Sequence, residues 1–218
     1  HKERAWVRGN YQETRLYYSK SFLDGRPPEF NLAAFVDIID GGAITGLASY
    51  NDTLIVFKTR SVYAVSGAGP SDTGTPVNSW DVQKIDESVG CVSPASVVVT
   101  PAGVMFQSER GFYMIDQGLS VQSIGEGIRR ELDSRPTGSV CYGAAVSVTR
   151  ALVKWLFVEG ATAIREYCFN YEYGTWTTNT MAESAYRGIT VDELGRFMYV
   201  TDGGNLLLEN GYHDIEDS

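Results

Sequence analysis

The chain has 218 residues, of which 43% are hydrophobic and 21% are charged, and its formal net charge is −9. This length allows one large β-domain or two small domains, and the composition is that of a globular protein rather than a disordered one. Thirteen Tyr, nine Phe and 23 Gly favour β-structure joined by tight turns. The acidic balance disfavours tight binding to nucleic acid, because Lys and Arg dominate the affinity for phosphates.

The negative charge is concentrated in the second half of the chain. Residues 111–218 carry 15 acidic and 8 basic side chains, and the chain finishes with the acidic run HDIEDS at 213–218. A short acidic run of this kind is typical of a solvated chain end.

Cysteine usage and hydropathy set further limits. Cys91, Cys141 and Cys168 lie far apart in or beside apolar stretches. An odd number of cysteines without a CxxC pair predicts buried free thiols rather than disulfides or a zinc site. No stretch approaches the roughly 18 apolar residues of a membrane helix, and no signal peptide is recognised. We expect no membrane span, and the missing initial Met suggests that residues 1–218 are an excerpt of a longer protein.

The first elements expected along the chain are short strands. RAWVRG (4–9) and TRLYYSK (14–20) come first, followed by ITGLASY (44–50). A hairpin is predicted over YNDTLIVFKTRSVYAVSG (50–67), where two apolar bursts flank a charged break, and the strand WDVQKID (80–86) follows it. Residues 66–79 are rich in Gly, Pro, Ser and Thr, which predicts a long loop of the kind where contacts are often placed.

The same order of elements recurs downstream. ASVVVT (95–100) precedes a hairpin over 99–118, and VQSIG (121–125) follows it. Then Ile124, Ile128 and Leu132, four residues apart, predict a short amphipathic helix of two or three turns near 124–134, ending before Pro136.

Two further units complete the chain. GAAVSVT (143–149), a long hairpin within 146–179 and TWTT (175–178) form the next four-stranded group. VDELGRFMYVTDGGNLLLENG (191–211) repeats the turn, strand, loop and strand of the earlier hairpins, with Gly195 in its first turn.

Equivalent positions in these units recur every 40 to 50 residues, which is the period of propeller blades rather than of helical repeats. The positions are Tyr18, Phe57, Phe106, Phe157 and Tyr199. Four short antiparallel strands per unit make one blade. We therefore predict an all-β fold, a β-propeller of about four to five four-stranded blades in a single domain over 1–218, in which the terminal strands share one blade. A β-sandwich is the alternative arrangement of these strands.

The residues offer little for catalysis. His1 and His213 are the two histidines of the chain, and both lie near its ends. This disfavours a Ser-His-Asp or Cys-His arrangement and imidazole metal sites. NYEYGTW (170–176) partly resembles the Asp-box of sialidases, but its spacing fits a turn at Gly174 followed by a core Trp. TDGGN (201–205) looks like a calcium loop but fits a hairpin turn better. We expect no catalytic residues, no cofactor and no metal.

The charged breaks in two hairpins are the candidate site. Lys58 and Arg60 interrupt the first hairpin, and Glu109 and Arg110 interrupt the second. These residues are expected at one rim of the ring, either as solvated hairpin tips or as a contact rim for a neighbouring subunit, where charges set the register of contact.

Several phrases resemble a known family. ITGLASYNDTLIVFKTRSVYAVSG (44–67), ESVGCVSPASVVVTPAGVMFQSERGFYMID (87–116) and IGEGIRREL (124–132) are similar to the β-propeller portion of tail proteins from short-tailed bacteriophages, namely the tail tubular or nozzle proteins and the packaged-DNA stabilisation proteins. The upstream RLYYSKSFLDGRPPEFN (15–31) is similar to a segment of the same proteins. The resemblance spans about residues 14 to 180 and includes no catalytic motif.

The resemblance implies a structural protein of the virion, made in the host cytoplasm, with several copies forming a ring around the channel through which DNA leaves. Its partners would be other copies of itself and neighbouring tail or portal proteins, with transient, non-specific passage of DNA. An acidic wall repels phosphate, which suits a conduit. Two other classes remain open: a carbohydrate- or receptor-binding propeller that uses exposed Trp and Tyr, and a glycoside hydrolase on a propeller fold.

Overall fold

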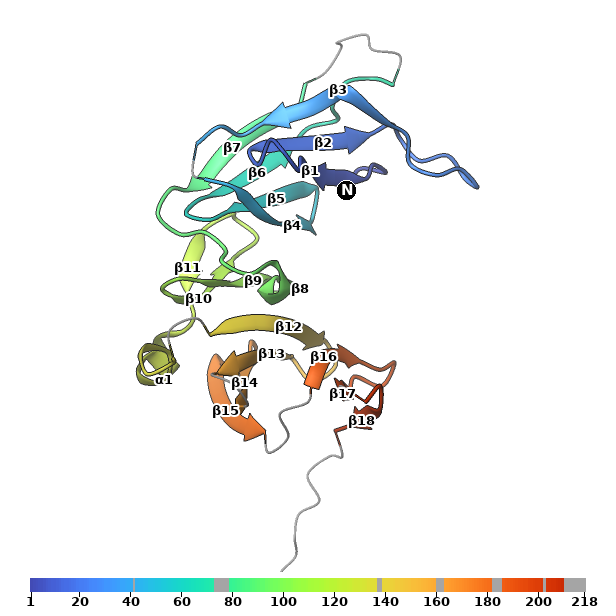
Figure 1. Ribbon diagram of the computed structural model, residues 1–218. Coiled ribbons are helices and arrows are strands. Elements are labelled where there is room, and N and C mark those ends of the chain that lie inside the picture. Colours follow the sequence, from blue (N-terminus) through green and yellow to red (C-terminus); the bar gives the residue numbers. More distant parts are fainter. Residues whose placement is uncertain are drawn as a thin grey trace, which may run out of the picture. The chain divides into compact units, whose positions relative to one another are not determined.

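Five antiparallel sheets make up the described structure, a computed structural model of the chain (Figure 1). It describes residues 1–40, 42–72, 79–136, 139–159, 163–181, 186–201 and 203–209. In every sheet, consecutive strands are hydrogen-bonded neighbours, so that each sheet is a simple meander. The chain divides into two compact units, His1–Ser123 and Ile124–Ser218.

The first unit contains three sheets. The first sheet has three strands and the second and third have four each. The strands are β1 (Trp6–Arg8), β2 (Arg15–Ser19) and β3 (Phe30–Asp37); β4 (Ile44–Tyr50), β5 (Thr53–Lys58), β6 (Val62–Ser66) and β7 (Asp81–Asp86); β8 (Val98–Thr100), β9 (Gly103–Ser108), β10 (Gly111–Ile115) and β11 (Val121–Ser123).

Apolar side chains between successive sheets hold this unit together. Leu16 and Ile38 of the first sheet region pack with Leu54 and Val56 of the second in one buried cluster. A second cluster joins the second and third sheets, and the rings of Phe57 and Phe106 meet there with centroids 4.8 Å apart. The three sheets are therefore layered through their apolar faces. Figure 1 shows them following one another in chain order within the unit.

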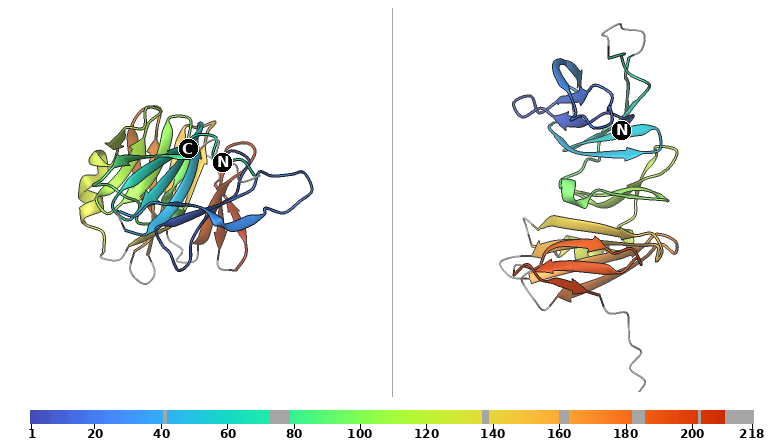
Figure 2. Two further views of the ribbon diagram at one scale, coloured as in Figure 1. Left: turned by 90° about the horizontal axis from the view of Figure 1, so that it is seen from above. Right: turned by 90° about the vertical axis from the view of Figure 1, so that its right-hand side faces the viewer.

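The second unit contains two sheets. One has four strands and the other has three. The strands are β12 (Val140–Ser147), β13 (Leu152–Glu159), β14 (Ala163–Asn170) and β15 (Thr175–Met181); β16 (Tyr186–Val191), β17 (Phe197–Thr201) and β18 (Leu206–Leu208). Leu156 and Ile164 pack with Phe197 and Tyr199 in a core shared by both sheets, and β12 lies beside β16 (Figure 2).

The burial of the aromatic marker residues confirms the predicted repeat of 40 to 50 residues. Its five marker residues all lie in the second strand of a sheet, and all are buried: Tyr18, Phe57, Phe106, Phe157 and Tyr199. The predicted hairpins and their flanking strands are also found where the alternation placed them. Two of the five sheets have three strands rather than four.

The predicted helix is present but short. A 3-10 turn, Glu126–Ile128, leads into helix α1, Arg129–Asp133, and Ile128 and Leu132 are buried as the spacing predicted. Gly125 and Gly127 lie at its start, and Gly has poor helix propensity, so the first turn takes the tighter 3-10 form. A second 3-10 turn, Pro94–Ser96, precedes β8. Among the described residues, no helix has the length and hydropathy needed to cross a membrane.

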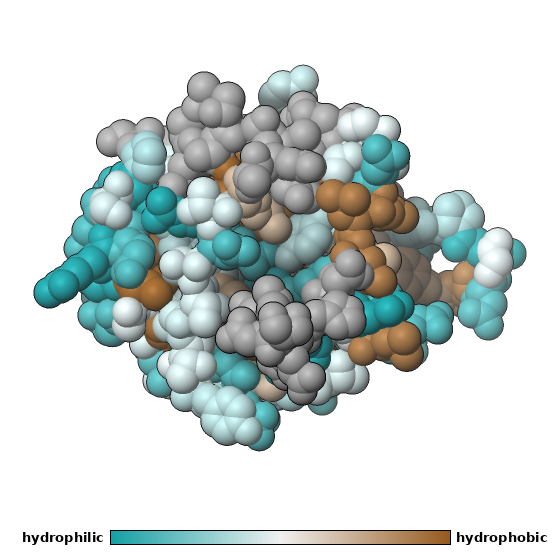
Figure 3. Space-filling view, turned by 90° about the horizontal axis from the view of Figure 1, so that it is seen from below, coloured by the Kyte–Doolittle hydropathy of each residue, from teal (hydrophilic) through white to brown (hydrophobic). Residues whose placement is uncertain are grey.

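One outer strand of each three-stranded sheet exposes hydrophobic side chains. All three leucines of β18 are accessible, as are Phe30 and Leu32 of β3. The face drawn in Figure 3 is mostly hydrophilic, with hydrophobic residues in separate patches.

The terminal strands each pair with a neighbour in their own sheet: β1 pairs with β2 and β18 pairs with β17. That the terminal strands share one blade, and that 1–218 is one domain, stay predictions.

Candidate functional site

Three of the four predicted rim residues line one polar pocket of about 250 Å³ in the first unit. Arg60 lies in the turn between β5 and β6, and Glu109 and Arg110 form the turn between β9 and β10. Glu87 and Ser88, which follow β7, complete its charged and hydroxyl lining. We call Arg60, Glu87, Glu109 and Arg110 the charged rim.

Lys58 does not belong to this rim, and its predicted exposure is wrong. The side chain is fully buried, and its Nζ donates hydrogen bonds to the carbonyl oxygens of Ile38 and Asp40. The Asp40 carboxylate accepts hydrogen bonds from Tyr63 and Lys84 beside it. Burial lowers the pKa of Lys58 below its usual range. The side chain turns inward because the segment after β3 brings carbonyl groups that need donors to the end of β5.

The segment after β7 holds the two hairpin turns together. The Cys91 N–H donates to the Lys58 carbonyl at 2.9 Å, and the Val92 N–H donates to the Gln107 carbonyl at 3.1 Å. The buried Ser96 hydroxyl accepts from the Gln107 N–H at 2.9 Å. This segment contains the run Gly-Cys-Val-Ser-Pro (90–94), which belongs to the phrase over 87–116 quoted from the sequence, so this part of the phrase has a structural role in shaping the rim.

Three of the four charges on the rim have no ion-pair partner among the described residues. Arg60, Glu109 and Arg110 are exposed, and none of the three forms an ion pair with any residue that the structure describes. Some other charges of this unit are paired, as in the Arg15–Asp37 bridge at 2.7 Å. Unpaired charges of both signs around one polar pocket are suited to bind complementary charges on another molecule.

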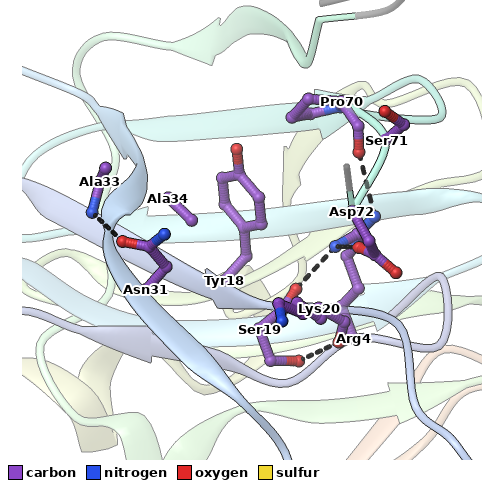
Figure 4. A pocket seen from close by; sticks show the side chains of 10 residues that line it. All are labelled: Arg4, Tyr18, Ser19, Lys20, Asn31, Ala33, Ala34, Pro70, Ser71 and Asp72. Atoms are coloured by element: carbon purple, nitrogen blue, oxygen red, sulfur yellow. Dashed lines mark hydrogen bonds and ion pairs between the residues drawn. The ribbon is translucent and has the colours of Figure 1, made fainter. Parts of the chain in front are cut away.

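A second pocket, of about 320 Å³, was not predicted from the sequence. It lies on the first sheet, where four residues of β3 face only one of β2, since the pairing passes from Tyr17↔Phe35 to Ser19↔Phe30. Figure 4 shows Tyr18 between the Asn31–Ala34 segment and the Pro70–Asp72 segment. We call it the Tyr18 pocket.

Buried polar groups shape the Tyr18 pocket. Arg4 is 7% exposed and donates to the carbonyls of Ser19 at 2.7 Å and Pro70 at 3.1 Å, and its guanidinium lies 2.8 Å from the Asp72 carboxylate. In the sequence, only the predicted long loop over 66–79 pointed to this part of the molecule. Residues 73–78 of that loop lie outside the described residues, while Pro70 and Asp72 line the pocket.

The second unit has a buried ionic cluster that the sequence did not indicate. Lys154 Nζ lies 3.1 Å from Glu166, 2.6 Å from Glu209 and 3.0 Å from the Tyr199 hydroxyl. The Tyr199 hydroxyl donates to Glu166 at 2.5 Å, and Arg150 pairs with Glu209 at 2.9 Å. Because these residues come from β13, β14, β17 and the ends of neighbouring strands, the cluster ties the two sheets of this unit together.

The other sequence motifs have structural roles. Gly174 adopts a positive φ of 66° in the turn before β15, and Trp176 donates to the Ile124 carbonyl at 2.7 Å. This confirms the turn at Gly174, while Trp176, which was expected in the core, is half-buried and packs on Trp155 and Phe169. In 201–205, the Gly204 N–H donates to the Thr201 carbonyl at 3.0 Å, as in a hairpin turn, while Asp202 lies outside the described residues.

The cysteine prediction is confirmed, since Cys91, Cys141 and Cys168 are all buried free thiols. Burial raises the pKa of Cys91 to about 11, which keeps this thiol protonated and poorly reactive at neutral pH. Within the described part of the chain, no group of three or more His, Cys, Asp or Glu side chains is placed to hold a metal ion.

Comparisons with known proteins address the fold. A scan against protein families finds no match, and a search of curated proteins finds none. Among solved structures, 97% of this chain aligns with 61% of YCF48 bound to a D1 peptide, at 12% identity and a TM-score of 0.57. The Dos1 propeller aligns with 94% of this chain over 55% of its own length, at 12% identity and a TM-score of 0.50.

A third similar structure is the extracellular domain of the putative hybrid two-component system BT3049 from B. thetaiotaomicron. It aligns with 94% of this chain over 28% of its own length, at 14% identity and a TM-score of 0.50. The chain thus spans less than two thirds of each of these three structures. Together with the five meander sheets, these similarities establish the fold class: the chain has an all-β, propeller-like fold.

Proposed function

We propose that this chain is a non-enzymatic structural module of a short-tailed bacteriophage tail, in the tail nozzle or head-completion hub. In this role several copies form a ring around the DNA exit channel, in contact with neighbouring tail or portal proteins. The protein is made in the host cytoplasm and becomes part of the virion. The sequence phrases over about residues 14 to 180 support the proposal, and the propeller-like fold is compatible with it.

The observation that carries the proposal is the charged rim. Two turns from neighbouring sheets place Arg60, Glu109 and Arg110 around one polar pocket, exposed and without ion pairs among the described residues. Charges that only keep a monomer in solution do not need to lie around one pocket. A surface that carries both positive and negative charges instead fixes the position in which a second molecule docks on it, because opposite charges attract and like charges repel.

The charge balance supports the part of the proposal that concerns DNA. The chain carries 27 acidic and 18 basic side chains. Because the affinity of proteins for DNA depends on neutralising phosphates with Lys and Arg, an acidic protein surrounds DNA with low affinity. Low affinity lets DNA pass along a channel without being retained.

Reversing both arginines of the rim tests the proposal. We expect the double substitution Arg60→Glu and Arg110→Glu to weaken self-association of the purified chain at least tenfold, because it turns the mixed rim into a wholly acidic one. The measurement is the concentration dependence of oligomer mass by mass photometry. Lys58 is left unchanged because a carboxylate at its buried position would unfold the hairpin.

The matched control is Arg26→Glu with Arg130→Glu, which makes the same change in net charge at two exposed positions outside the rim. It is expected to leave oligomer mass unchanged at physiological salt, since distant surface charges are screened. Equal self-association of the rim variant and the native chain would contradict the proposed role of the rim.

A further inference from the structure

The Tyr18 pocket contains a hydroxyl group that has no hydrogen-bond partner among the described residues. Tyr18 is 8% exposed, and its ring packs against Trp6 and Trp80 at centroid distances of 5.3 and 5.6 Å. Its hydroxyl accepts or donates no hydrogen bond to any described residue, although the side chain lines the pocket. Because this hydroxyl opens into the pocket, it can exchange a hydrogen bond to water for one to a ligand.

The charges around the pocket are already compensated. Arg4 is paired with Asp72 at 2.8 Å, and Lys20 is paired with Glu29 at 2.8 Å. A strongly anionic ligand would meet the Asp72 carboxylate, and a cationic ligand would meet Arg4 and Lys20. The pocket therefore favours an uncharged ligand.

The remaining lining offers hydrogen-bonding groups of both kinds beside apolar surface. Asn31 uses its side-chain oxygen to accept from the Ala33 N–H at 2.9 Å, which leaves its amide NH₂ group as a donor. Asp72 is an acceptor, and the Tyr18 hydroxyl can act as either. Ala33 and Ala34 add methyl groups on the β3 side (Figure 4).

From these features we propose that the Tyr18 pocket binds one uncharged hexopyranose unit of a glycan. A sugar ring has hydroxyl groups that both donate and accept, and its C–H face packs on methyl and aromatic groups. The cavity of about 320 Å³ is at the small end of ligand-binding pockets, as suits a single ring. The exposed Trp and Tyr considered in the sequence do not form this pocket. Trp6, Trp80 and Trp176 are half-buried and Trp155 is buried. The exposed Tyr11 and Tyr173 do not line it.

The test is saturation-transfer NMR and titration of the chain with a panel of methyl glycosides of glucose, galactose, mannose and N-acetylglucosamine. At least one glycoside is expected to bind. Tyr18→Phe keeps the ring and removes only the hydroxyl, so affinity should fall about three- to tenfold, as for loss of one hydrogen bond. Tyr17→Phe is the matched control, because the Tyr17 hydroxyl bonds Gln12 outside the pocket and binding should be unchanged.

A second pair of variants guards against an effect on folding. Ala33 is exposed, so Ala33→Phe should fill the pocket and abolish binding without unfolding the chain. Leu32→Phe, at an 83% exposed neighbour that does not line the pocket, should leave binding intact. Failure of every glycoside to bind would overturn the proposal. So would binding that survives Ala33→Phe, or a preference for N-acetylglutamate amide or N-acetyllysine amide over all the sugars.

Discussion

Replacing Lys154 with Ala is expected to lower the free energy of unfolding of the second unit by about 3–5 kcal/mol, as for loss of one partner from a buried ion pair. The Lys154 and Glu166 side chains are only 6% and 5% exposed. Without the ammonium group, Glu166 keeps the Tyr199 hydroxyl as its hydrogen-bond donor, but its charge is left uncompensated in a poorly solvated site. Urea unfolding followed by circular dichroism measures the effect.

Two variants separate this explanation from simple loss of packing. Lys154→Met with Glu166→Gln removes both charges and keeps similar volumes, so it should recover much of the stability lost in Lys154→Ala. Arg196→Ala breaks the exposed Arg196–Asp192 pair at 2.8 Å and should cost no more than about 1 kcal/mol. If Arg196→Ala cost as much as Lys154→Ala, the special contribution of the buried cluster would be refuted.

The shifted pKa values of groups in the same cluster predict how the free energy of unfolding depends on pH. For Glu209, burial acts to raise the pKa, but hydrogen bonds and charge from Lys154 and Arg150 lower it overall, from the ordinary value of 4.5. Its stabilisation is therefore complete above about pH 4.5 and is lost as the pH falls through the lowered folded-state value.

At alkaline pH, the stabilisation by the buried ionic cluster depends on the charge of Lys154. Burial acts to lower its pKa, but the charges of Glu166 and Glu209 raise it overall, from the ordinary value of 10.5, so its contribution is lost only as the pH rises beyond that value. Unfolding free energies measured from pH 3 to 9 should fall on the acid side, and Glu209→Gln should flatten that fall. A native-like acid slope in Glu209→Gln would count against this assignment.

Gly90→Ala is expected to destabilise the first unit by about 3 kcal/mol, at the upper end of the cost of overpacking. A Cβ at this position would lie 2.3 Å from the Lys58 carbonyl oxygen, 2.4 Å from the Thr59 carbonyl carbon and 2.5 Å from the Arg60 nitrogen. All three atoms are backbone, so relief requires the β5–β6 turn to move away. That movement would also break the Cys91 hydrogen bond to Lys58 and open the charged rim.

Gly188→Ala in β16 is the matched control. A Cβ there meets no atom within 4 Å, so the change should alter stability by less than about 0.5 kcal/mol. Equal stability of Gly90→Ala and Gly188→Ala in urea unfolding would show that the approach of Gly90 to the turn does not hold the rim together.

Local patterns were sufficient to predict most of the strands and their grouping, although β3 and β16 were not predicted. Alternating apolar residues bounded by Gly turns predicted the hairpins, and the aromatic markers from Tyr18 to Tyr199 predicted a buried second strand in each sheet. The burial of Ile128 and Leu132 followed from their spacing, although two glycines shortened the α-helix. These features depend on residues that are close together in the sequence, so local sequence patterns are enough to predict them.

The site residues depended on contacts between distant segments. Lys58 lies at a hairpin end, where lysines are usually solvated, but the carbonyls of Ile38 and Asp40 approach it from the segment after β3. Glu87 joins Arg60 and Arg110 only because Gly90 allows the chain to pass close to the β5–β6 turn. The Tyr18 pocket requires β3 to separate from β2 and the Pro70–Asp72 segment to reach Arg4. No local pattern in the sequence signals these approaches.

Imaging of the purified chain tests the central proposal most directly. Negative-stain electron microscopy, on samples across a range of concentrations, should show closed rings of several copies with a central opening, and Arg60→Glu with Arg110→Glu should remove them. A chain that stays monomeric at every concentration, or that forms only open irregular assemblies, would contradict the proposed ring around a DNA channel.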